Sequence, residues 1–338
     1  MKTSKTIKSL IFLFVLSVAG QVSFSQQLPL YSQYLYNKFL INPAHAGSDG
    51  YTSYNITARE QWIGYSGAPR TYSLSCQTRI LKKTYRINQN IFSKTVYRSR
   101  TTGRVGFGGY IFSDRNGLVQ RTGFQTSYTY SLWVQDYTQI SMGLGLTGYH
   151  FRINFDENSF KEAAEPLLNN KLRRGVFVPD MDFGVYLLNP RFDIGFSALQ
   201  MLGEVSKIGN YAYRNFWIDR HFYLFGSYTF YSGVKSEIQP TILLKMSEQV
   251  RPQADIGLSY NYDQTIWAGI AYRTGEALIT NIRYKLIPSH VKMTSLYIGY
   301  AFDFTLNEIQ RTTYGTHEVT MALKFGERSK RFRWIDRY

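Results

Sequence analysis

The residue types that most often carry catalysis or bind metals are few in this chain and poorly spaced. The five histidines are scattered, and the single cysteine, Cys76, excludes both a zinc–cysteine site and an internal disulfide. His317 and Glu318 are neighbours in a stretch with strand-like alternation, so their side chains would point to opposite faces and could not act together. No serine has the sequence context of a nucleophile elbow. We therefore expect a protein that is not an enzyme, without a cofactor or a metal.

Two other motifs match known sites in letters only. The stretch "GLGLTG", residues 143–148, has the spacing of the dinucleotide fingerprint, but that motif needs a strand that ends at the glycines and a helix that begins there. Here the alternation continues through the glycines, so we expect them to face a space that other atoms approach closely. The acidic residues in and before "ENSFKEAAEPLL", residues 157–168, could hold calcium. They lack the spacing of a dedicated calcium site, which favours the solvated face of a short helix.

The first residues have the order of a secretion signal. Three lysines precede the apolar run "LIFLFVLSVAG", residues 10–20, and "SFS", residues 23–25, supplies a small-x-small cleavage site. The apolar run is too short to span a bilayer, which favours cleavage over a signal anchor that is kept. We predict a signal peptide at 1–25, a mature chain that starts at Gln26, and an exported protein.

The composition of the chain favours a membrane over nucleic acid. It contains 28 Tyr and 23 Phe, and its formal net charge is +16. For an exported protein, this charge favours anionic outer-membrane lipid or an acidic partner, and we expect no contact with nucleic acid. No apolar run long enough for a transmembrane helix follows Gln26, but the strands of a membrane barrel carry a weaker signal of about ten alternating residues.

That weaker signal recurs along the chain. In "RTYSLSCQTRI" (70–80), "TQISMGLGLTG" (138–148) and "QADIGLSYNY" (253–262), apolar residues fill most even positions, and small or polar residues fill the odd ones. Such alternation suits a wall between lipid and water. A soluble β-sandwich also alternates, but it would not need so many aromatic residues near strand ends. We predict an all-β fold, a transmembrane antiparallel β-barrel of about fourteen strands over 51–326. The strands are expected to start near residues 51, 70, 104, 121, 138, 181, 191, 220, 236, 253, 264, 277, 293 and 316.

The lengths of the connections predict the orientation of the barrel. Short turns such as "VQDY", "NP", "SGVK", "DQ" and "PSHVK" would be periplasmic, and the long connections 153–180, 200–219 and 306–315 would face outward. One predicted periplasmic loop, 81–103, breaks this rule because it is long and basic. It is either a solvated insertion or miscounted strand pair, or a docking surface for an acidic partner. Its basic residues are Lys82, Lys83, Arg86, Lys94, Arg98 and Arg100.

The stretch before the first strand, within residues 26–50, shows no strand alternation. A barrel of about fourteen strands is wider than its own wall side chains can fill. Our hypothesis is that "YSQYLYNKFLINPAHAG", residues 31–47, folds into the lumen or across its periplasmic mouth as a plug; the alternative is a loose periplasmic tether. Tyr31, Tyr34 and Leu35 have helical spacing, and Asn42-Pro43 would end that turn. The expected contacts of this plug, or of a partner, are Tyr31, Gln33, Tyr34, Asn37, Asn42, Pro43, Gly47, Arg59, Gln61 and Trp62.

The chain continues beyond the last predicted strand. Residues 327–338, "ERSKRFRWIDRY", alternate basic with aromatic residues. Such a tail is either a partner-binding segment with aromatic anchors or a solvated end, and the sequence favours neither.

The two N-terminal motifs carry a resemblance to a known family. The stretches "YSQYLYNKFLINPAHAG" and "REQWIGYSGAPRTYSLS" (59–75), followed in order by "RHFYLFGSYTF", "WAGIAYRTGEA" and "YGTHEVTMALKF", resemble the PorP/SprF family. The resemblance covers nearly the whole mature chain and implies an outer-membrane barrel associated with the type IX secretion system and gliding motility. His45 stands where the family pattern has an aromatic residue, usually Tyr. The long 81–103 stretch also departs from the pattern and suggests a specialised paralogue with a different partner.

What the resemblance implies is a non-enzymatic, multi-pass protein of the cell outer membrane. Its partners would be a secreted adhesin, engaged through its C-terminal region for export or display, or periplasmic components of the type IX secretion system. The architecture alone would also suit a transporter of solutes or hydrophobic compounds. A third class, an outer-membrane hydrolase, would need a reactive serine.

Overall fold

The structure, a computed structural model, describes residues 31–90, 93–135, 138–154, 175–203, 219–248, 250–287 and 294–325, and the side chains of these except 81–103. The predicted signal peptide at 1–25, the acidic stretch at 157–168 and the basic tail at 327–338 lie outside the described residues. No helix in the described part of the chain is both long and apolar enough to cross a membrane.

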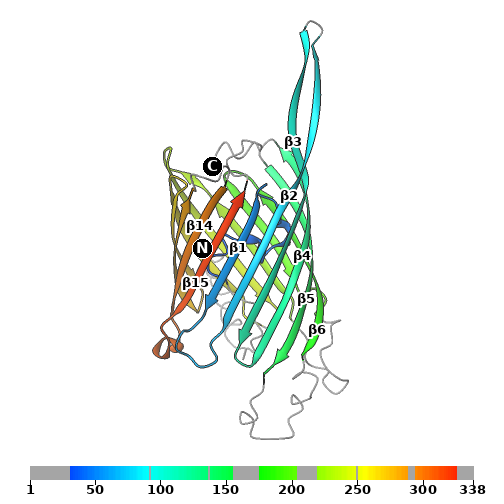
Figure 1. Ribbon diagram of the computed structural model, residues 1–338. Helices are drawn as coiled ribbons and strands as arrows, with labels where there is room; N and C mark the ends of the chain where they lie inside the picture. Colours follow the sequence, from blue (N-terminus) through cyan, green and yellow to red (C-terminus); the bar gives the residue numbers. More distant parts are fainter. Residues whose placement is uncertain are drawn as a thin grey trace, which may run out of the picture.

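The described residues form a closed antiparallel barrel of 14 wall strands (Figure 1). Each wall strand pairs with the next one along the chain, and the last pairs with the first, β15 with β1. A two-residue strand, β9 (Phe230–Tyr231), continues the line of β8 along β10. The wall strands are β1 Thr52–Glu60, β2 Arg70–Asn90, β3 Ser93–Asn116, β4 Val119–Gln135, β5 Thr138–Ile153, β6 Val176–Leu188, β7 Phe192–Leu199, β8 His221–Tyr228, β10 Ser236–Ser247, β11 Gln253–Tyr262, β12 Ile266–Arg273, β13 Ala277–Leu286, β14 Thr294–Thr305 and β15 Thr316–Phe325.

The predicted fold class and strand number are confirmed, and most strand starts agree to within two residues. The third strand is the main exception, because it begins at Ser93 and not near residue 104. The stretch 81–103, predicted to be a loop, is in fact a continuation of β2 and β3 as a two-stranded hairpin, paired from Lys82 with Thr102 to Asn88 with Val96. The sequence left open a solvated insertion or miscounted strand pair and a docking surface; the pairing shows that the stretch lengthens two wall strands and adds none to their number.

The hairpin extends past the rest of the wall. The neighbouring strand β1 pairs with β2 only as far as Gln77, and β4 pairs with β3 only from Val105. The ribbon therefore projects from one rim of the barrel (Figure 1).

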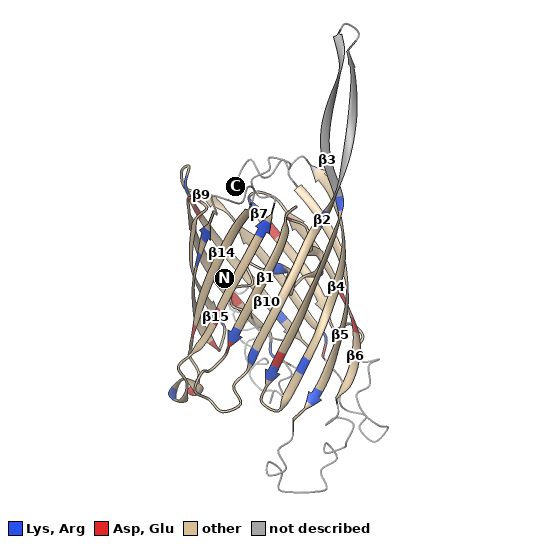
Figure 2. Cartoon of the chain, in the orientation of Figure 1, with Lys and Arg blue, Asp and Glu red and all other residues tan. Residues whose placement is uncertain are grey.

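Connection lengths distinguish the two rims. The rim that carries the hairpin has otherwise short connections at 136–137, 189–191, 232–235, 263–265 and 287–293, and we name it the periplasmic rim. The opposite end, the outer rim, includes the longer connections 61–69, 154–175, 200–220 and 306–315. Lys and Arg positions gather at this outer rim on the front strands of Figure 2, at the lower end of the barrel.

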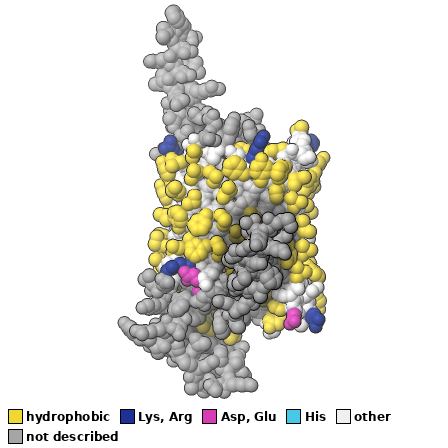
Figure 3. All heavy atoms as spheres, turned by 180° about the vertical axis from the view of Figure 1, so that it is seen from behind, with side chains coloured by type: hydrophobic (Ala, Val, Ile, Leu, Met, Phe, Trp, Pro, Cys, Tyr) yellow, Lys and Arg dark blue, Asp and Glu magenta, His cyan; other side chains and the backbone are white. Residues whose placement is uncertain are grey.

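The two faces of the wall differ in chemistry. Large apolar side chains such as Ile56, Leu74 and Leu144 point outward and are 44 to 53% exposed, whereas Ser53 and Thr57 point inward and are buried. In space-filling view, hydrophobic side chains cover much of the visible back face of the barrel, with charged residues near its upper and lower edges (Figure 3). This is the arrangement that a barrel needs when lipid surrounds it.

The N-terminal residues 31–50, here named the lumenal segment, lie inside the barrel. They contain two single-turn 3-10 helices, η1 (Lys38–Leu40) and η2 (Pro43–His45). The helical turn predicted from the spacing of Tyr31, Tyr34 and Leu35 is not a helix, but η1 does end at Leu40, just before Asn42-Pro43. Asn42 then begins η2, because its side chain accepts a hydrogen bond from the Ala44 N–H at 2.9 Å and Pro43 occupies the first helical position.

The lipid-facing assignment of β1 predicts a large cost for a charge at its centre. Ile56 is the middle residue of β1, and we expect Ile56→Arg to lower the free energy of unfolding in lipid vesicles by about 2–4 kcal/mol. Tyr65, in the connection after β1, has the same exposure of 53% and provides the control. Tyr65→Arg should cost about 0–1 kcal/mol. Equal urea-unfolding curves for the two variants would contradict the assignment.

Candidate functional site

The lumenal segment is attached to the wall first through Glu318, on β15. The two carboxylate oxygens of Glu318 accept the backbone N–H groups of Ser32 and Gln33 at 2.8 and 2.9 Å. The Gln33 side chain donates to the Glu318 carbonyl oxygen at 2.9 Å and accepts from the Thr320 hydroxyl at 2.9 Å. These contacts fix the position of the segment along the barrel axis.

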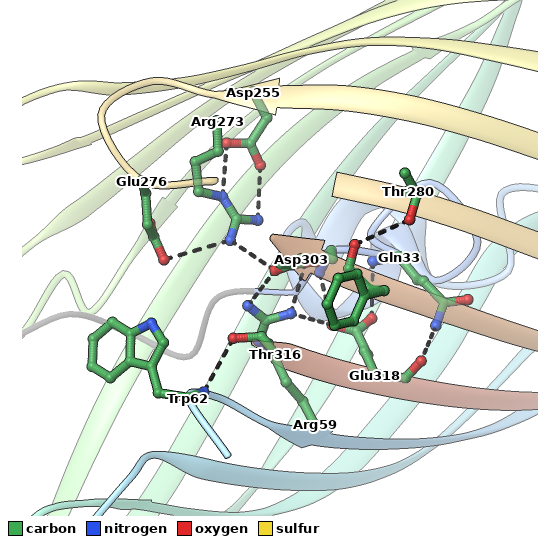
Figure 4. A network of polar contacts seen from close by, with 12 residues as sticks. Gln33, Arg59, Trp62, Asp255, Arg273, Glu276, Thr280, Asp303, Thr316 and Glu318 are labelled. Carbon is green, nitrogen blue, oxygen red and sulfur yellow. Dashed lines mark hydrogen bonds and ion pairs between the residues drawn. The ribbon is translucent and has the colours of Figure 1, made fainter. Parts of the chain in front are cut away.

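Glu318 belongs to a buried group of charges in the lumen, the lumenal ion-pair cluster (Figure 4). Arg59 on β1 contacts Glu318 at 3.0 Å and Asp303 at 2.8 Å, and Arg273 on β12 contacts Asp303 at 3.5 Å and Asp255 at 3.0 Å. Arg59 and Glu318 have side chains that are only 1% exposed. Charges buried this deeply need all their partners, since removal of one leaves the others uncompensated.

Ser32 connects the lumenal segment directly to this cluster. Its hydroxyl donates to Asp303 at 2.6 Å and accepts from Arg59 at 2.7 Å. Lys245 on β10 extends the cluster, with its ammonium 2.7 Å from Asp255. The cluster therefore joins wall strands from β10 to β1 and the start of the lumenal segment in one network.

The middle of the segment reaches other parts of the wall. The Asn37 amide donates to the Ser75 hydroxyl on β2 at 3.0 Å, and the Tyr36 hydroxyl donates to Asn281 on β13 at 3.0 Å. Lys38 forms an ion pair with Asp193 on β7. These three contacts lie on well-separated strands, so the segment crosses the lumen and does not follow one side of it.

One side of the lumen is apolar, and the apolar side chains of the segment pack there. Tyr34, Leu40 and Ile41 join a buried cluster with wall residues that include Tyr223 and Phe225 of β8. The rings of Tyr34 and Phe225 meet edge to face with centroids 6.0 Å apart. The segment therefore has polar and apolar side chains, and each kind lies against wall residues of the same kind.

The end of the segment is held by backbone contacts. The Asn42 amide donates to the carbonyl oxygens of Val185 and Phe196, both at 3.1 Å, and the Thr129 hydroxyl donates to the Pro43 carbonyl oxygen at 2.9 Å. Farther on, the Arg79 guanidinium donates to the Ser48 carbonyl oxygen at 3.1 Å. Gln77 lies beside it and accepts the Gly47 N–H at 3.4 Å.

Glycines of the wall make room for the segment. A Cβ atom at Gly143 would lie 2.4 Å from the Ala44 nitrogen, and one at Gly184 would lie 2.1 Å from the Asn42 side-chain oxygen. Real Cβ atoms do not approach other atoms so closely, so only glycine fits at these positions. The prediction that the glycines of 143–148 face closely approaching atoms is confirmed for Gly143 and Gly145. A Cβ atom at Gly145 would lie 2.6 Å from the Gln125 side-chain nitrogen.

His45, which departs from the family pattern, is buried against Tyr186 with ring centroids 5.1 Å apart. Burial lowers the pKa of its imidazole to about 4. The ring is therefore neutral near pH 7 and acts as an aromatic packing group.

Most of the sequence-predicted contacts meet in the lumen, but Gln61 and Trp62 do not. Tyr31, Gln33, Tyr34, Asn37, Asn42, Pro43, Gly47 and Arg59 lie in or against the lumenal segment. Strand β1 ends at Glu60, and the Gln61 N–H donates to the Pro69 carbonyl oxygen within the next connection. The Trp62 N–H donates to the Thr316 hydroxyl at 3.2 Å, at the outer rim. Gln61 was placed on the lumenal face by continuing the alternation of β1 past its end at Glu60.

Sequence reasoning missed the wall partners Glu318, Asp303, Arg273 and Asp255. Each stands at an inward position of an alternating stretch, where a charged residue would be buried. These charged residues at inward positions were the signal from which the cluster could have been predicted. The prediction that His317 and Glu318 face opposite ways holds, because Glu318 is lumenal and His317 accepts or donates a hydrogen bond with the half-exposed Tyr300 hydroxyl at 2.7 Å.

The described part of the chain contains no cluster of metal ligands. Within those residues, no group of three or more His, Cys, Asp or Glu could hold a metal ion. A cavity of about 60 Å³ remains between the segment and the wall, next to Leu40, Tyr149 and Tyr223.

An apolar outer belt, alternating strands and a polar lumen that contains the chain's own N-terminal segment define an integral outer-membrane β-barrel protein. A family model described as "Type IX secretion system membrane protein PorP/SprF" matches residues 23–323. The chain therefore belongs to the PorP/SprF family, and its place is the outer membrane. A comparison with curated protein sequences found no significant match.

Several solved barrels are similar in fold. The toluene transporter TbuX of Ralstonia pickettii aligns at 13% identity and TM-score 0.45, over 85% of this chain and 92% of the transporter. The CymD monoaromatic hydrocarbon channel aligns at 10% identity and TM-score 0.49, over 89% and 94% of the two chains. A FadL homologue of Pseudomonas aeruginosa aligns at 9% identity and TM-score 0.43, over 82% and 89%.

The buried cluster predicts a large effect at Arg59. We expect Arg59→Met to lower the free energy of unfolding by about 3–5 kcal/mol, because it leaves Asp303 and Glu318 buried without their shared cation. Arg70→Met is the control, since Arg70 is exposed and lies 4.0 Å from Glu60. It should cost about 0–1 kcal/mol in the same urea-unfolding measurement. A similar small cost at both sites would argue against the cluster.

The glycine contacts predict that a larger residue at position 143 displaces the lumenal segment. Gly143→Val should expose the segment to trypsin, with cleavage after Lys38 at least tenfold faster than in the wild type, while the strands stay protected. Gly226→Val is the matched control, because a Cβ there meets its nearest neighbour at an ordinary 3.5 Å. Equal cleavage rates in the two variants would show that the segment does not depend on this contact.

Proposed function

We propose that this protein is a non-enzymatic barrel that binds a secreted surface protein through that protein's C-terminal region, or a periplasmic component of the type IX secretion machinery, and so supports export or display. Family membership already associates the chain with that machinery. One combined observation carries the proposal: the lumen is occupied by residues 31–50 while a hairpin projects from the periplasmic rim.

The occupied lumen is the first argument. The lumenal segment makes hydrogen bonds or ion pairs with strands around the circumference, from β15 through β2 and β7 to β13. We infer that the segment closes the barrel to solutes of substrate size. A partner would then meet the rims of the barrel and not its interior.

The hairpin is the second argument. Beyond Gln77 and Val105, the outer edges of β2 and β3 have no partner strand among the described residues. Such edges can add a strand from another protein. The sequence from 81 to 103 contains six basic residues and no acidic residue, which favours an acidic partner and steers its approach.

A shortened hairpin tests the proposed interaction. In this variant a two-residue Asn-Gly turn replaces residues 82–102, and the purified barrel is compared with the wild type for the proteins that it retains from outer membranes. We expect the loss of a periplasmic machinery component or of the secreted protein, with unchanged heat-modifiable gel mobility. The matched control keeps the hairpin and changes its six basic residues to Gln, which separates charge from shape. Retention of the same partners by the shortened barrel would contradict a role for the hairpin.

Transport remains the second candidate, and the cavity beside Tyr149 is the observation that favours it. We expect the wild-type barrel to be electrically silent in planar bilayers and a variant that lacks residues 31–47 to conduct, because about fourteen strands enclose more space than wall side chains fill. Gly226→Val again provides a folded control. Stable open channels in the wild type would overturn closure and favour transport.

A further inference from the structure

An outward-facing row of arginines lies at the outer rim on neighbouring strands. In the strand register, Arg70 of β2 stands directly opposite Arg115 of β3, Arg115 opposite Gln120 of β4, and Gln120 opposite Arg152 of β5. All three arginines are exposed, and they lie on the lipid side of the wall. Figure 2 shows this concentration of basic residues along the lower ends of the front strands.

The row has too little negative charge of its own. The carboxylate of Glu60 lies 4.0 Å from Arg70, and this pair is largely exposed. Arg152 donates to the Gln120 side chain at 2.7 Å, and Arg115 has no ion pair with any residue that the structure describes. Like charges directly opposite each other destabilise a sheet, so the facing pair Arg70 and Arg115 calls for an anion.

A second row lies one step closer to the membrane centre, about 7 Å along the strands. There Tyr72, Ser113, Thr122 and His150 stand opposite one another in the same order of strands. The Ser113 and Thr122 hydroxyls are 3.4 Å apart, and the Tyr72 hydroxyl donates to Glu60 at 2.9 Å. This row offers hydroxyl and imidazole groups to a polar ligand.

Farther toward the membrane centre, beyond the second row, the wall becomes apolar. Leu74, Ile111 and Phe124 are the next outward-facing residues of β2, β3 and β4, and they are 44 to 57% exposed. At the same rim, β6 and β14 carry the large apolar side chains Phe177 and Phe304, and β1 carries Glu60. The order of an arginine row, a hydroxyl row and an apolar row, from the outer rim toward the membrane centre, is therefore a property of the face formed by β2 to β5.

We propose that this face binds a phosphorylated glycolipid of the outer leaflet, a lipopolysaccharide. The arginine row binds the phosphate groups through bidentate guanidinium contacts, and the second row forms hydrogen bonds with sugar hydroxyls. The apolar residues contact the acyl chains. From β2 to β5 the row spans about 14 Å, which suits a disaccharide headgroup with more than one phosphate better than a single phosphate. The inference is independent of the proposed secretion partner, since it concerns the lipid face of the wall.

The test measures lipid binding to the full-length barrel by native mass spectrometry in mild detergent. The probes are lipopolysaccharide with its phosphates, the same lipopolysaccharide after removal of phosphate, and phosphatidylglycerol. The variant R70Q/R115Q/R152Q removes the row. The variant R191Q/K235Q/R311Q removes the same charge from exposed sites elsewhere and is the matched control.

We expect the row variant to bind phosphorylated lipopolysaccharide at least tenfold more weakly than the wild type and the control variant. The dephosphorylated probe should bind the wild type as weakly as the intact probe binds the row variant. A version with three lysines, R70K/R115K/R152K, should recover binding only in part, because lysine keeps the charge and loses the bidentate fork.

Two results would overturn the proposal. Equal binding of intact lipopolysaccharide to the row and control variants would exclude the arginine row as its site. Binding of phosphatidylglycerol as tight as that of lipopolysaccharide would show that a single phosphate suffices and that no glycolipid is recognised. Heat-modifiable gel mobility establishes that each variant is folded, so a loss of binding reports on the face and not on the barrel.

Discussion

The position of Arg59 between Asp303 and Glu318 is the interaction on which the rest of the lumen depends. Buried charges are tolerated only when their partners are complete, and here the last partners are supplied by Ser32 and Gln33 of the lumenal segment. The backbone N–H groups of these two residues occupy both oxygens of Glu318. The wall and the segment are therefore one structure: without the segment the cluster would be exposed to lumenal water, and without the cluster the segment would lose its fixed point.

The need for this arrangement follows from the size of the barrel. A narrow barrel fills its interior with wall side chains, whereas a wide one contains water. In this barrel the inward side chains are often small, such as Ser53, Ser75 and Gly143, and the lumenal segment occupies the space that they leave. Small wall residues and a large filling segment are complementary parts of one packing solution, which explains why glycine stands where Ala44 approaches to within van der Waals contact.

The sequence predicts features that repeat locally and fails on those that depend on pairing across the barrel. Alternation revealed the strands because each outward residue, such as Ile256 or Leu258, meets lipid. It could not reveal that Ser32 meets Glu318, since 286 positions separate them and their meeting depends on which strands close the barrel. Gln61 was misplaced because the sequence does not show that β1 ends at Glu60. The sequence left open whether 81–103 is an insertion or a pair of strands, because that depends on the pairing of β2 with β3 beyond the wall.

Strand β2 runs through three parts of this barrel: the lipid face, the lumen and the hairpin. Its outer end carries Arg70 on the lipid face, its middle carries Ser75 and Gln77 in contact with the lumenal segment, and its far end forms the hairpin beyond the periplasmic rim. Arg79, which holds the Ser48 carbonyl oxygen, lies directly before the part of β2 that leaves the wall. The contacts of Gln77 and Arg79 with Gly47 and Ser48 therefore hold the end of the lumenal segment at the point where β2 leaves the wall.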